Sequence, residues 1–194
     1  METVSSIFTA FGLSASAGLN AYVPLLVVAL TARFTDWITL TEPWDAMRSW
    51  WVIGALLILG LVEFFADKIP AVNHINDIVQ TFIRPTAGAI AFAASANVIT
   101  EVHPVLAIIA GLLIAGSVHT VKSVAIRPTV TATTGGTANV PVSVAEDVVA
   151  MLLSILSVVL PVLIAAVIIL VTAWIVFRLW RKTRQESVSG KPEI

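Results

Sequence analysis

The sequence predicts an all-α integral membrane protein with about six transmembrane helices, an internal repeat and broken or re-entrant segments of small residues. Hydrophobic residues make up 58% of the chain and charged residues 12%, whereas soluble domains contain about 45–50% and about 25%. Apolar stretches also recur at the roughly 20-residue length of a membrane-spanning helix. The 194 residues fit one domain, which we expect to be a transmembrane domain at 1–181 followed by a polar cytoplasmic tail at 182–194.

Five apolar stretches supply the expected six crossings. The first is interrupted by small polar residues and by Pro24. The last is 39 residues long, which is too long for one crossing, and Pro161 is expected to divide it because proline disrupts a helix interior. In chain order, the stretches lie at 4–31, 50–66, 86–100, 102–117 and 142–180.

The distribution of basic residues predicts the orientation, because Lys and Arg are enriched in cytoplasmic loops. The region after the last stretch is strongly basic, and counting six crossings back from it places most other basic residues on the same side. We therefore expect a multi-pass protein of the inner (cytoplasmic) membrane, with both termini in the cytoplasm and the loop at 35–49 outside. The basic residues on the cytoplasmic side are Lys68, Arg84, Lys122, Arg127, Arg178, Arg181, Lys182 and Arg184.

Charge and residue types exclude several classes of protein. The net charge of −1 argues against a nucleic-acid partner, and the lack of cysteine excludes disulfides and thiol catalysis. No nucleophile–base arrangement is visible, and the three histidines lack metal-ligand spacing. We therefore expect no enzyme, no metal and no cofactor. The expected partners are the lipid bilayer and a small, anionic solute, and the sequence leaves a homo-oligomer open.

An internal repeat is predicted from the alignment of the chain with itself at an offset of 117 residues. The copies start near residues 3 and 120 and bring the segment 14–24 opposite 131–141. Both segments are rich in small and hydroxyl-bearing residues and end in proline, which is typical of the interrupted helices at the solute sites of transporters. Parallel and inverted repeats are both compatible with the sequence.

The paired segments are expected to bind a small solute. Glycine permits turns with positive φ, and the N–H groups freed where a helix breaks attract an anion or a carboxylate. Two Ile-Arg-Pro-Thr strings add an arginine where proline is expected to end a helix, as a clamp for carboxylate or phosphate. Close helix packing and the positive-inside bias are the respective alternatives. The candidate substrate-binding residues are Ser14, Ser16, Gly18, Asn20, Arg84, Arg127, Thr133, Thr134, Gly135 and Asn139.

Carboxylates within apolar stretches are further candidates, because an ionisable group inside a membrane span is costly. Glu63 lies between Leu-Val and Phe-Phe, and Asp67 follows four residues later on the same helix face. We expect Glu63 to pair with Lys122, Arg84 or Arg127, or to carry a coupling proton; a carboxylate that reaches headgroup water is the alternative. Glu146 and Asp147 are interpreted as favouring the N-terminus of their helix through its dipole.

Two helix patterns complete the prediction. Residues 68–84 form an amphipathic helix whose polar stripe, from Asn73 to Arg84, faces either interfacial water or an internal cavity. Small residues recur every fourth position at 87–95 and 107–115, which predicts close packing between these neighbouring helices.

Three strings in the chain resemble a bacterial membrane family of unknown function, the domain-of-unknown-function family "forty-one twenty-six". They are GLSASAGLNAY at 12–22, EFFADKIP at 63–70 and TTGGTAN at 133–139. The resemblance covers nearly all of the chain up to about Arg181; it implies an integral membrane protein and supplies no substrate or site residue. The residues themselves favour a small-solute transporter or channel, of anion or carboxylate type. A non-transporting membrane scaffold or lipid-interacting protein is the alternative.

Overall fold

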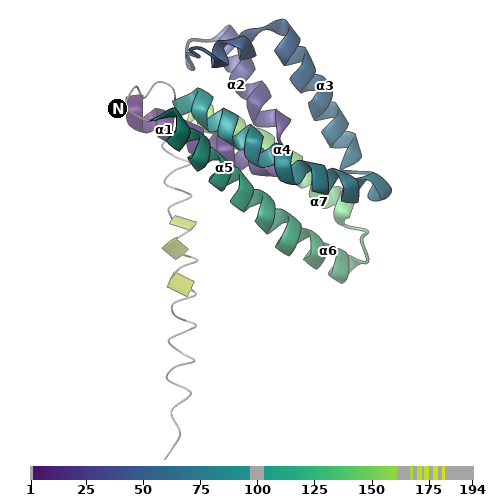
Figure 1. Ribbon diagram of the computed structural model, residues 1–194. Helices are drawn as coiled ribbons and strands as arrows, with labels where there is room; N and C mark the ends of the chain where they lie inside the picture. The colour runs from purple at the N-terminus through teal and green to yellow at the C-terminus, as the bar shows by residue number, and fades with distance from the viewer. Residues whose placement is uncertain are drawn as a thin grey trace, which may run out of the picture.

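The computed structural model describes residues 2–96, 103–160, 167, 170, 171, 173, 174, 177, 178 and 181, with the backbone alone at 2–5 and 70–74. These residues are helical with short connections, and no strand occurs among them (Figure 1). The elements are α1 (Glu2–Leu19), α2 (Tyr22–Phe34), η1 (Trp44–Arg48), α3 (Trp50–Ala66), α4 (Pro70–Ala96), α5 (Pro104–Thr120), η2 (Val121–Ile126), α6 (Arg127–Thr134) and α7 (Asn139–Val159).

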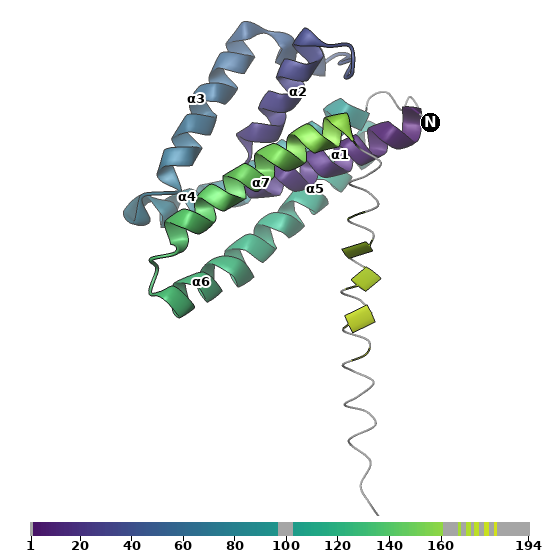
Figure 2. The ribbon, with the colours of Figure 1, turned by 180° about the vertical axis from the view of Figure 1, so that it is seen from behind.

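Helix α1 lies at the centre of the bundle. It packs against α4 and α5 on one side and against α7 on the other, as the two opposite views show (Figures 1 and 2). Helices α2 and α3 pack against each other beside this group, and α6 extends beyond it at the end of α5. The all-helical part of the predicted fold class is therefore confirmed.

Small residues form the contact between α1, α4 and α5. The small residues that recur every fourth position at 87–95 and 107–115, such as Ala91 and Ala115, are buried. The predicted close packing of their helices is therefore confirmed. A Cβ atom at Gly88 would lie 2.9 Å from the carbonyl oxygen of Gly111 and 3.0 Å from Oγ of Ser14. Backbones can approach this closely only where side chains are small.

Both predicted small-residue segments contain a helix break. In the first, α1 ends at Leu19 and α2 begins at Tyr22, so the first apolar stretch forms two helices instead of one interrupted span. In the second, Gly135 and Gly136 adopt φ values of 61° and 87°, which glycine allows, and turn the chain from α6 into α7. Helices α2 and α7 begin 117 residues apart, at Tyr22 and Asn139, which equals the offset of the repeat; the repeat itself stays a prediction.

The expectation that the two Arg-Pro strings end helices is wrong. Pro85 lies inside α4, which joins the predicted amphipathic helix to the third apolar stretch. Pro128 lies in a continuous helix from Pro104 to Thr134. Here the π-helical element η2 precedes the proline, and a π-helical turn shifts the hydrogen-bond pattern that proline would interrupt. The hydroxyl of Thr129 also donates to the carbonyl oxygen of Ala125 at 2.7 Å, satisfying one of the nearby carbonyl groups.

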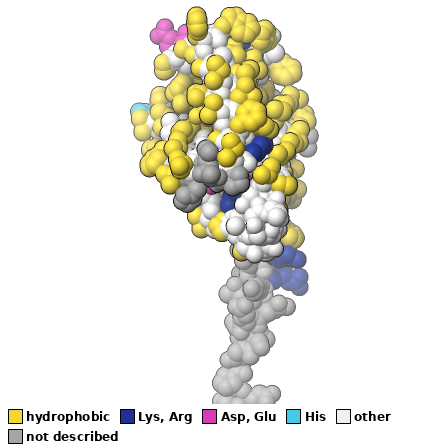
Figure 3. All heavy atoms as spheres, turned by 90° about the vertical axis from the view of Figure 1, so that its right-hand side faces the viewer, with side chains coloured by type: hydrophobic (Ala, Val, Ile, Leu, Met, Phe, Trp, Pro, Cys, Tyr) yellow, Lys and Arg dark blue, Asp and Glu magenta, His cyan; other side chains and the backbone are white. Residues whose placement is uncertain are grey.

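The described surface carries many large hydrophobic side chains. Trp51 is 90% exposed, Phe82 74% and Leu113 60%, and Figure 3 shows hydrophobic side chains over most of one face. By length and composition, Pro104–Thr134 and Asn139–Val159 could each cross a membrane, whereas α2 and α3 are shorter apolar helices. The predicted division at Pro161, the crossing that follows it, the tail at 182–194 and the end of the third stretch at 97–100 lie outside the described residues, apart from single positions.

Candidate functional site

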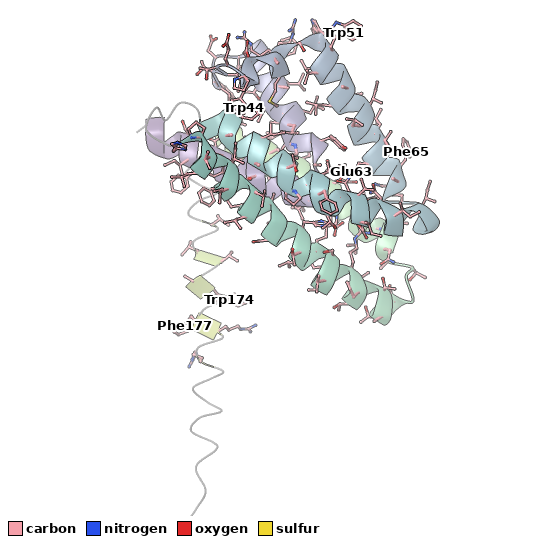
Figure 4. The ribbon with its side chains drawn as sticks, viewed as in Figure 1. Trp44, Trp51, Glu63, Phe65, Trp174 and Phe177 are labelled. Carbon is pink, nitrogen blue, oxygen red and sulfur yellow. The ribbon has the colours of Figure 1, made fainter. Side chains whose placement is uncertain are left out.

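Six ionisable side chains come together inside the bundle, and we call them the charge cluster. They carry three formal positive and three formal negative charges, and each is at most 10% exposed. Figure 4 shows Glu63 pointing into the bundle while Phe65, two residues along α3, points away from it. The charge cluster consists of Glu63, Asp67, Arg84, Lys122, Arg127 and Glu146.

Arg84 links α3, α4 and α5 through its guanidinium group. Its Nε and Nη2 atoms donate to Oε1 of Glu63 at 3.2 and 3.0 Å, and Nη2 also donates to Oδ2 of Asp67 at 3.4 Å. Its Nη1 atom lies 3.3 Å from Nδ1 of His119. Because arginine has no acceptor, Nδ1 accepts this bond. The imidazole is therefore neutral and carries its proton on Nε2, which lies 3.2 Å from the hydroxyl of Thr81.

Asp67 occupies the centre of the charge cluster. Its Oδ2 atom lies 3.4 Å from Arg84, 3.7 Å from Arg127 and 3.8 Å from Lys122, and its Oδ1 accepts a 2.6 Å hydrogen bond from Asn76. One carboxylate thus joins three cations that come from three different elements. Because a buried charge without a partner is costly, these interactions hold the elements together.

Glu146 completes the charge cluster from α7. Its Oε2 atom accepts from Nη2 of Arg127 at 2.7 Å and lies 3.0 Å from Nζ of Lys122. The same lysine donates to the carbonyl oxygen of Leu19 at 3.1 Å, which places a cation at the C-terminal end of α1, where the helix dipole favours it.

The break between α1 and α2 is closed by side chains. Oδ1 of Asn20 accepts from the N–H groups of Tyr22 and Val23 at 3.2 and 3.1 Å, and Oε2 of Glu63 accepts from the N–H of Ala21 at 3.1 Å. Proline follows at position 24 and has no N–H to satisfy. The N–H groups at the start of α2 are therefore bound within the protein and are not available to a solute.

An outer ion pair lies next to the charge cluster. Nζ of Lys68 lies 2.8 Å from Oδ2 of Asp147, and the two side chains are 15% and 12% exposed. Oδ1 of Asp147 accepts from Nδ2 of Asn20 at 3.0 Å. The pair therefore connects the end of α3, the break after α1 and the middle of α7.

A polar cavity of about 340 Å³ opens beside the charge cluster. Its walls include Asp67 and Lys68 on one side and the turn between α6 and α7 on the other, with Gly135 and Asn139. Close to it in the structure, Nε and Nη1 of the buried Arg127 have no hydrogen-bond partner among the described residues. Buried polar atoms are nearly always bonded, so free ones call for an explanation. Together, a cavity and unused donors form a candidate site for a ligand with acceptor atoms.

Comparison with known families identifies the chain. The family described as Domain of unknown function (DUF4126) matches residues 7–182. The chain belongs to the DUF4126 family. No curated protein and no solved structure matches it, so the match confirms the resemblance seen in the sequence and adds no activity.

In this DUF4126 protein, the predicted substrate-binding residues lie in three environments. Ser14, Ser16 and Gly18 are buried in helix contacts, where Ser16 donates to the carbonyl oxygen of Ala150 at 2.7 Å. The hydroxyls of Thr133 and Thr134 bond to carbonyl groups of their own helix. The others lie at the polar region just described: Asn20, Arg84, Arg127, Gly135 and Asn139.

The structure decides some of the alternatives for the carboxylates, while a coupling proton on Glu63 stays a prediction. Glu63 is 2% exposed and pairs with Arg84, one of its three predicted partners, so the headgroup-water alternative is wrong. The helix-dipole interpretation of Glu146 and Asp147 is also wrong, because α7 begins at Asn139, two turns earlier. Glu146 binds cations from η2 and α6 instead, and Asp147 binds Lys68 in the turn between α3 and α4.

The structure also shows contacts of this region that the sequence does not predict or leaves undecided. Gln80 and Arg84 are 2% and 0% exposed, so this end of the polar stripe faces the interior and not interfacial water. His119 is a buried, hydrogen-bonded histidine, as expected for a histidine without metal-ligand spacing. The pairing of Lys68 with Asp147 was missed, and no local pattern indicates it, because 79 residues separate the two.

Proposed function

We propose that this protein is a multi-pass membrane protein that transports a small solute bearing a carboxylate or another anionic group. Membrane embedding is supported by an inside-out distribution of polarity. Six charged side chains are buried while large hydrophobic side chains such as Leu113 and Trp51 are exposed, the reverse of a soluble protein. Exposed apolar surface on this scale is typical of contact with lipid or with a partner.

The proposed orientation keeps the charge cluster on the cytoplasmic side. The N-terminal part of α1 lies at the other end of the bundle and not in the cytoplasm, because Ile7 packs against the same hydrophobic cluster as Trp44 of the loop between α2 and α3. The loop between α2 and α3 then lies on the outer side with Trp37 and Trp51, which are 68% and 90% exposed. Arg33 stacks on Trp50 at 4.1 Å from its ring centroid. Exposed tryptophan with nearby arginine is typical of the boundary between membrane and water.

The observation that carries the transport proposal is the polar cavity next to Arg127. Asp67 lines the cavity and lies 3.7 Å from Nη2 of Arg127, whose Nε and Nη1 atoms have no hydrogen-bond partner among the described residues. A guanidinium group binds carboxylate and phosphate well because its donors match their oxygens. The second small-residue segment, and not the first, supplies the cavity wall in this proposal.

Ligand-induced stabilisation tests this proposal. The purified protein is screened by thermal shift against small carboxylates and phosphates, and the compounds that stabilise it are assayed for uptake into proteoliposomes. At a concentration of 100 times Kd, a ligand adds about 2.7 kcal/mol of stability. We expect Arg127→Lys, which keeps a cation beside Glu146 but removes Nε and Nη1, to abolish both the stabilisation and the uptake. Arg48→Lys, at an exposed position, is the matched control and should retain both.

Either of two results would contradict the proposal. One is a folded wild-type protein that none of the compounds stabilises and that takes up none of them. The other is an Arg127→Lys variant that binds and transports like the wild type. The first result would favour the alternative function, a non-transporting membrane scaffold or lipid-interacting protein. The burial of Ser14, Ser16 and Gly18 in helix contacts supports this alternative.

A further inference from the structure

A second cavity lies on the other side of the outer ion pair, between α2, α3 and α7. This groove has a volume of about 350 Å³, which is within the range of roughly 300–1,000 Å³ that small-molecule sites occupy. Most of its lining is aliphatic, with Leu56 at the base and Leu57 and Met151 at the open edge, 48% and 52% exposed. A ligand with a sizeable apolar part therefore fits it better than a polar solute does.

The groove contains one carboxylate and two aromatic side chains among mainly aliphatic ones. Among the described residues that line it, Asp147 is the one charged side chain. The aromatic rings of Tyr22 and Phe64 also line it, and the face of an aromatic ring attracts cations. The charge of Asp147 is balanced by Lys68 at 2.8 Å, but its oxygens and the aromatic ring faces in an otherwise apolar groove still attract a cation more than an anion.

The protein already binds an ammonium group at one end of the groove. Nζ of Lys68 lies 2.8 Å from Oδ2 of Asp147 and 3.2 Å from the ring centroid of Phe64. Lys68 itself lines the polar cavity, whereas Asp147 and Phe64 line the groove. The lysine thus reaches from one cavity to the end of the other and shows that this end accommodates a cation.

We propose that the groove binds an amphipathic cation, with the positive group at Asp147 and the aromatic rings and the apolar part along α3 and α7. The carboxylate of Asp147 has the capacity for a further partner, since its two oxygens accept one bond each from Lys68 and Asn20. The open edge at Leu57 and Met151 lets such a ligand enter from the exposed apolar surface. This site is separate from the charge cluster and does not depend on the transport proposed above.

Gly60 provides a direct way to fill the groove. It lines the groove on α3, and a Cβ atom there would lie 3.5 Å from Cβ of Tyr22, which is an ordinary contact. The side chain of Gly60→Leu would extend into the space that the ligand needs. Gly54 lies on the same helix outside the groove, with nothing within 4 Å of a Cβ atom, so Gly54→Leu is a matched control.

Binding of two amphiphiles with the same apolar chain and head groups of opposite charge tests the proposal. Radiolabelled decylammonium and decyl sulfonate are titrated onto the full-length protein in lipid nanodiscs, and the signal of empty nanodiscs is subtracted. We expect saturable binding of the cation and none of the anion. Gly60→Leu should abolish this binding, Gly54→Leu should leave it unchanged, and Asp147→Asn should weaken it about tenfold, as loss of a charge partner does.

Three results would overturn the proposal. Equal binding of the two ions would show that the groove selects apolar surface and not charge. Cation binding that survives Gly60→Leu would place it elsewhere. Cation binding that is unchanged in Asp147→Asn would remove the carboxylate from the site. Melting temperatures of the variants, measured in the same nanodiscs, establish that each compared protein is folded.

Discussion

Replacing Arg84 by methionine will lower the free energy of unfolding by about 3–5 kcal/mol, the usual cost of breaking a buried ion pair. Methionine fills much of the volume but leaves Glu63 and Asp67 without the cation that lies 3.0 and 3.4 Å from them. It also removes the donor to His119. Unfolding of the detergent-solubilised protein by sodium dodecyl sulfate, followed by circular dichroism, measures the change.

Two further variants make this prediction specific to the charge cluster. Arg48→Met alters an exposed arginine and should change stability by no more than about 0.5 kcal/mol. The double variant Glu63→Leu with Arg84→Met removes both partners of the ion pair. It should be more stable than the sum of the two single changes predicts, by at least about 1 kcal/mol. Additive single and double effects would show that the two residues do not stabilise each other.

Gly88→Val is expected to lower the free energy of unfolding by about 3 kcal/mol, the upper end of the usual cost of overpacking. A Cβ atom at this position would lie 2.9 Å from the carbonyl oxygen of Gly111 and would also collide with Ala115. The first of these is a backbone atom, so the helices α4 and α5 must separate to accommodate it. The same unfolding titration measures the effect.

Gly116→Val, on the face of α5 that is not packed tightly, is the control for this change. The nearest atom to a Cβ there is 3.8 Å away in Pro85, so the variant should be no less stable than the wild type, because valine has a higher helix propensity than glycine. If both valine variants were equally stable, the close contact between α4 and α5 would not be important for stability.

The sequence predicted the parts of the site that rest on local patterns. Glu63 stands alone in an apolar run, and Asp67 follows one helical turn later, so the sequence predicts that the two share a helix face and offers a basic partner for Glu63 as one of its interpretations. The four-residue spacing of small residues likewise predicted the α4–α5 contact. These signals are readable because helix geometry alone decides which residues share a face.

The remaining features depend on contacts between distant segments. The packing of α3 on α4 decides which of the three basic residues pairs with Glu63. Glu146 contacts Lys122 and Arg127 only because α7 runs back along the bundle. The sequence predicts that proline ends a helix. The helix nevertheless continues through Pro128, because the π-helical turn before it shifts the hydrogen-bond pattern that proline would interrupt. No local pattern contains these tertiary effects.

The central claim is that the charged interior is enclosed by a surface that faces lipid. Spin labels on single cysteines test it, because the chain has no native cysteine. The label is placed at Ile58, Leu113 or Ile155, which are 63%, 60% and 45% exposed on three different helices, and at Thr39 in the exposed loop as the reference for water. In proteoliposomes, collisions with oxygen, which concentrates in the bilayer, are compared with collisions with a water-soluble nickel chelate. We predict that oxygen collisions dominate at the three helix positions and nickel collisions at Thr39; nickel collisions as frequent at the helix positions as at Thr39 would contradict the account.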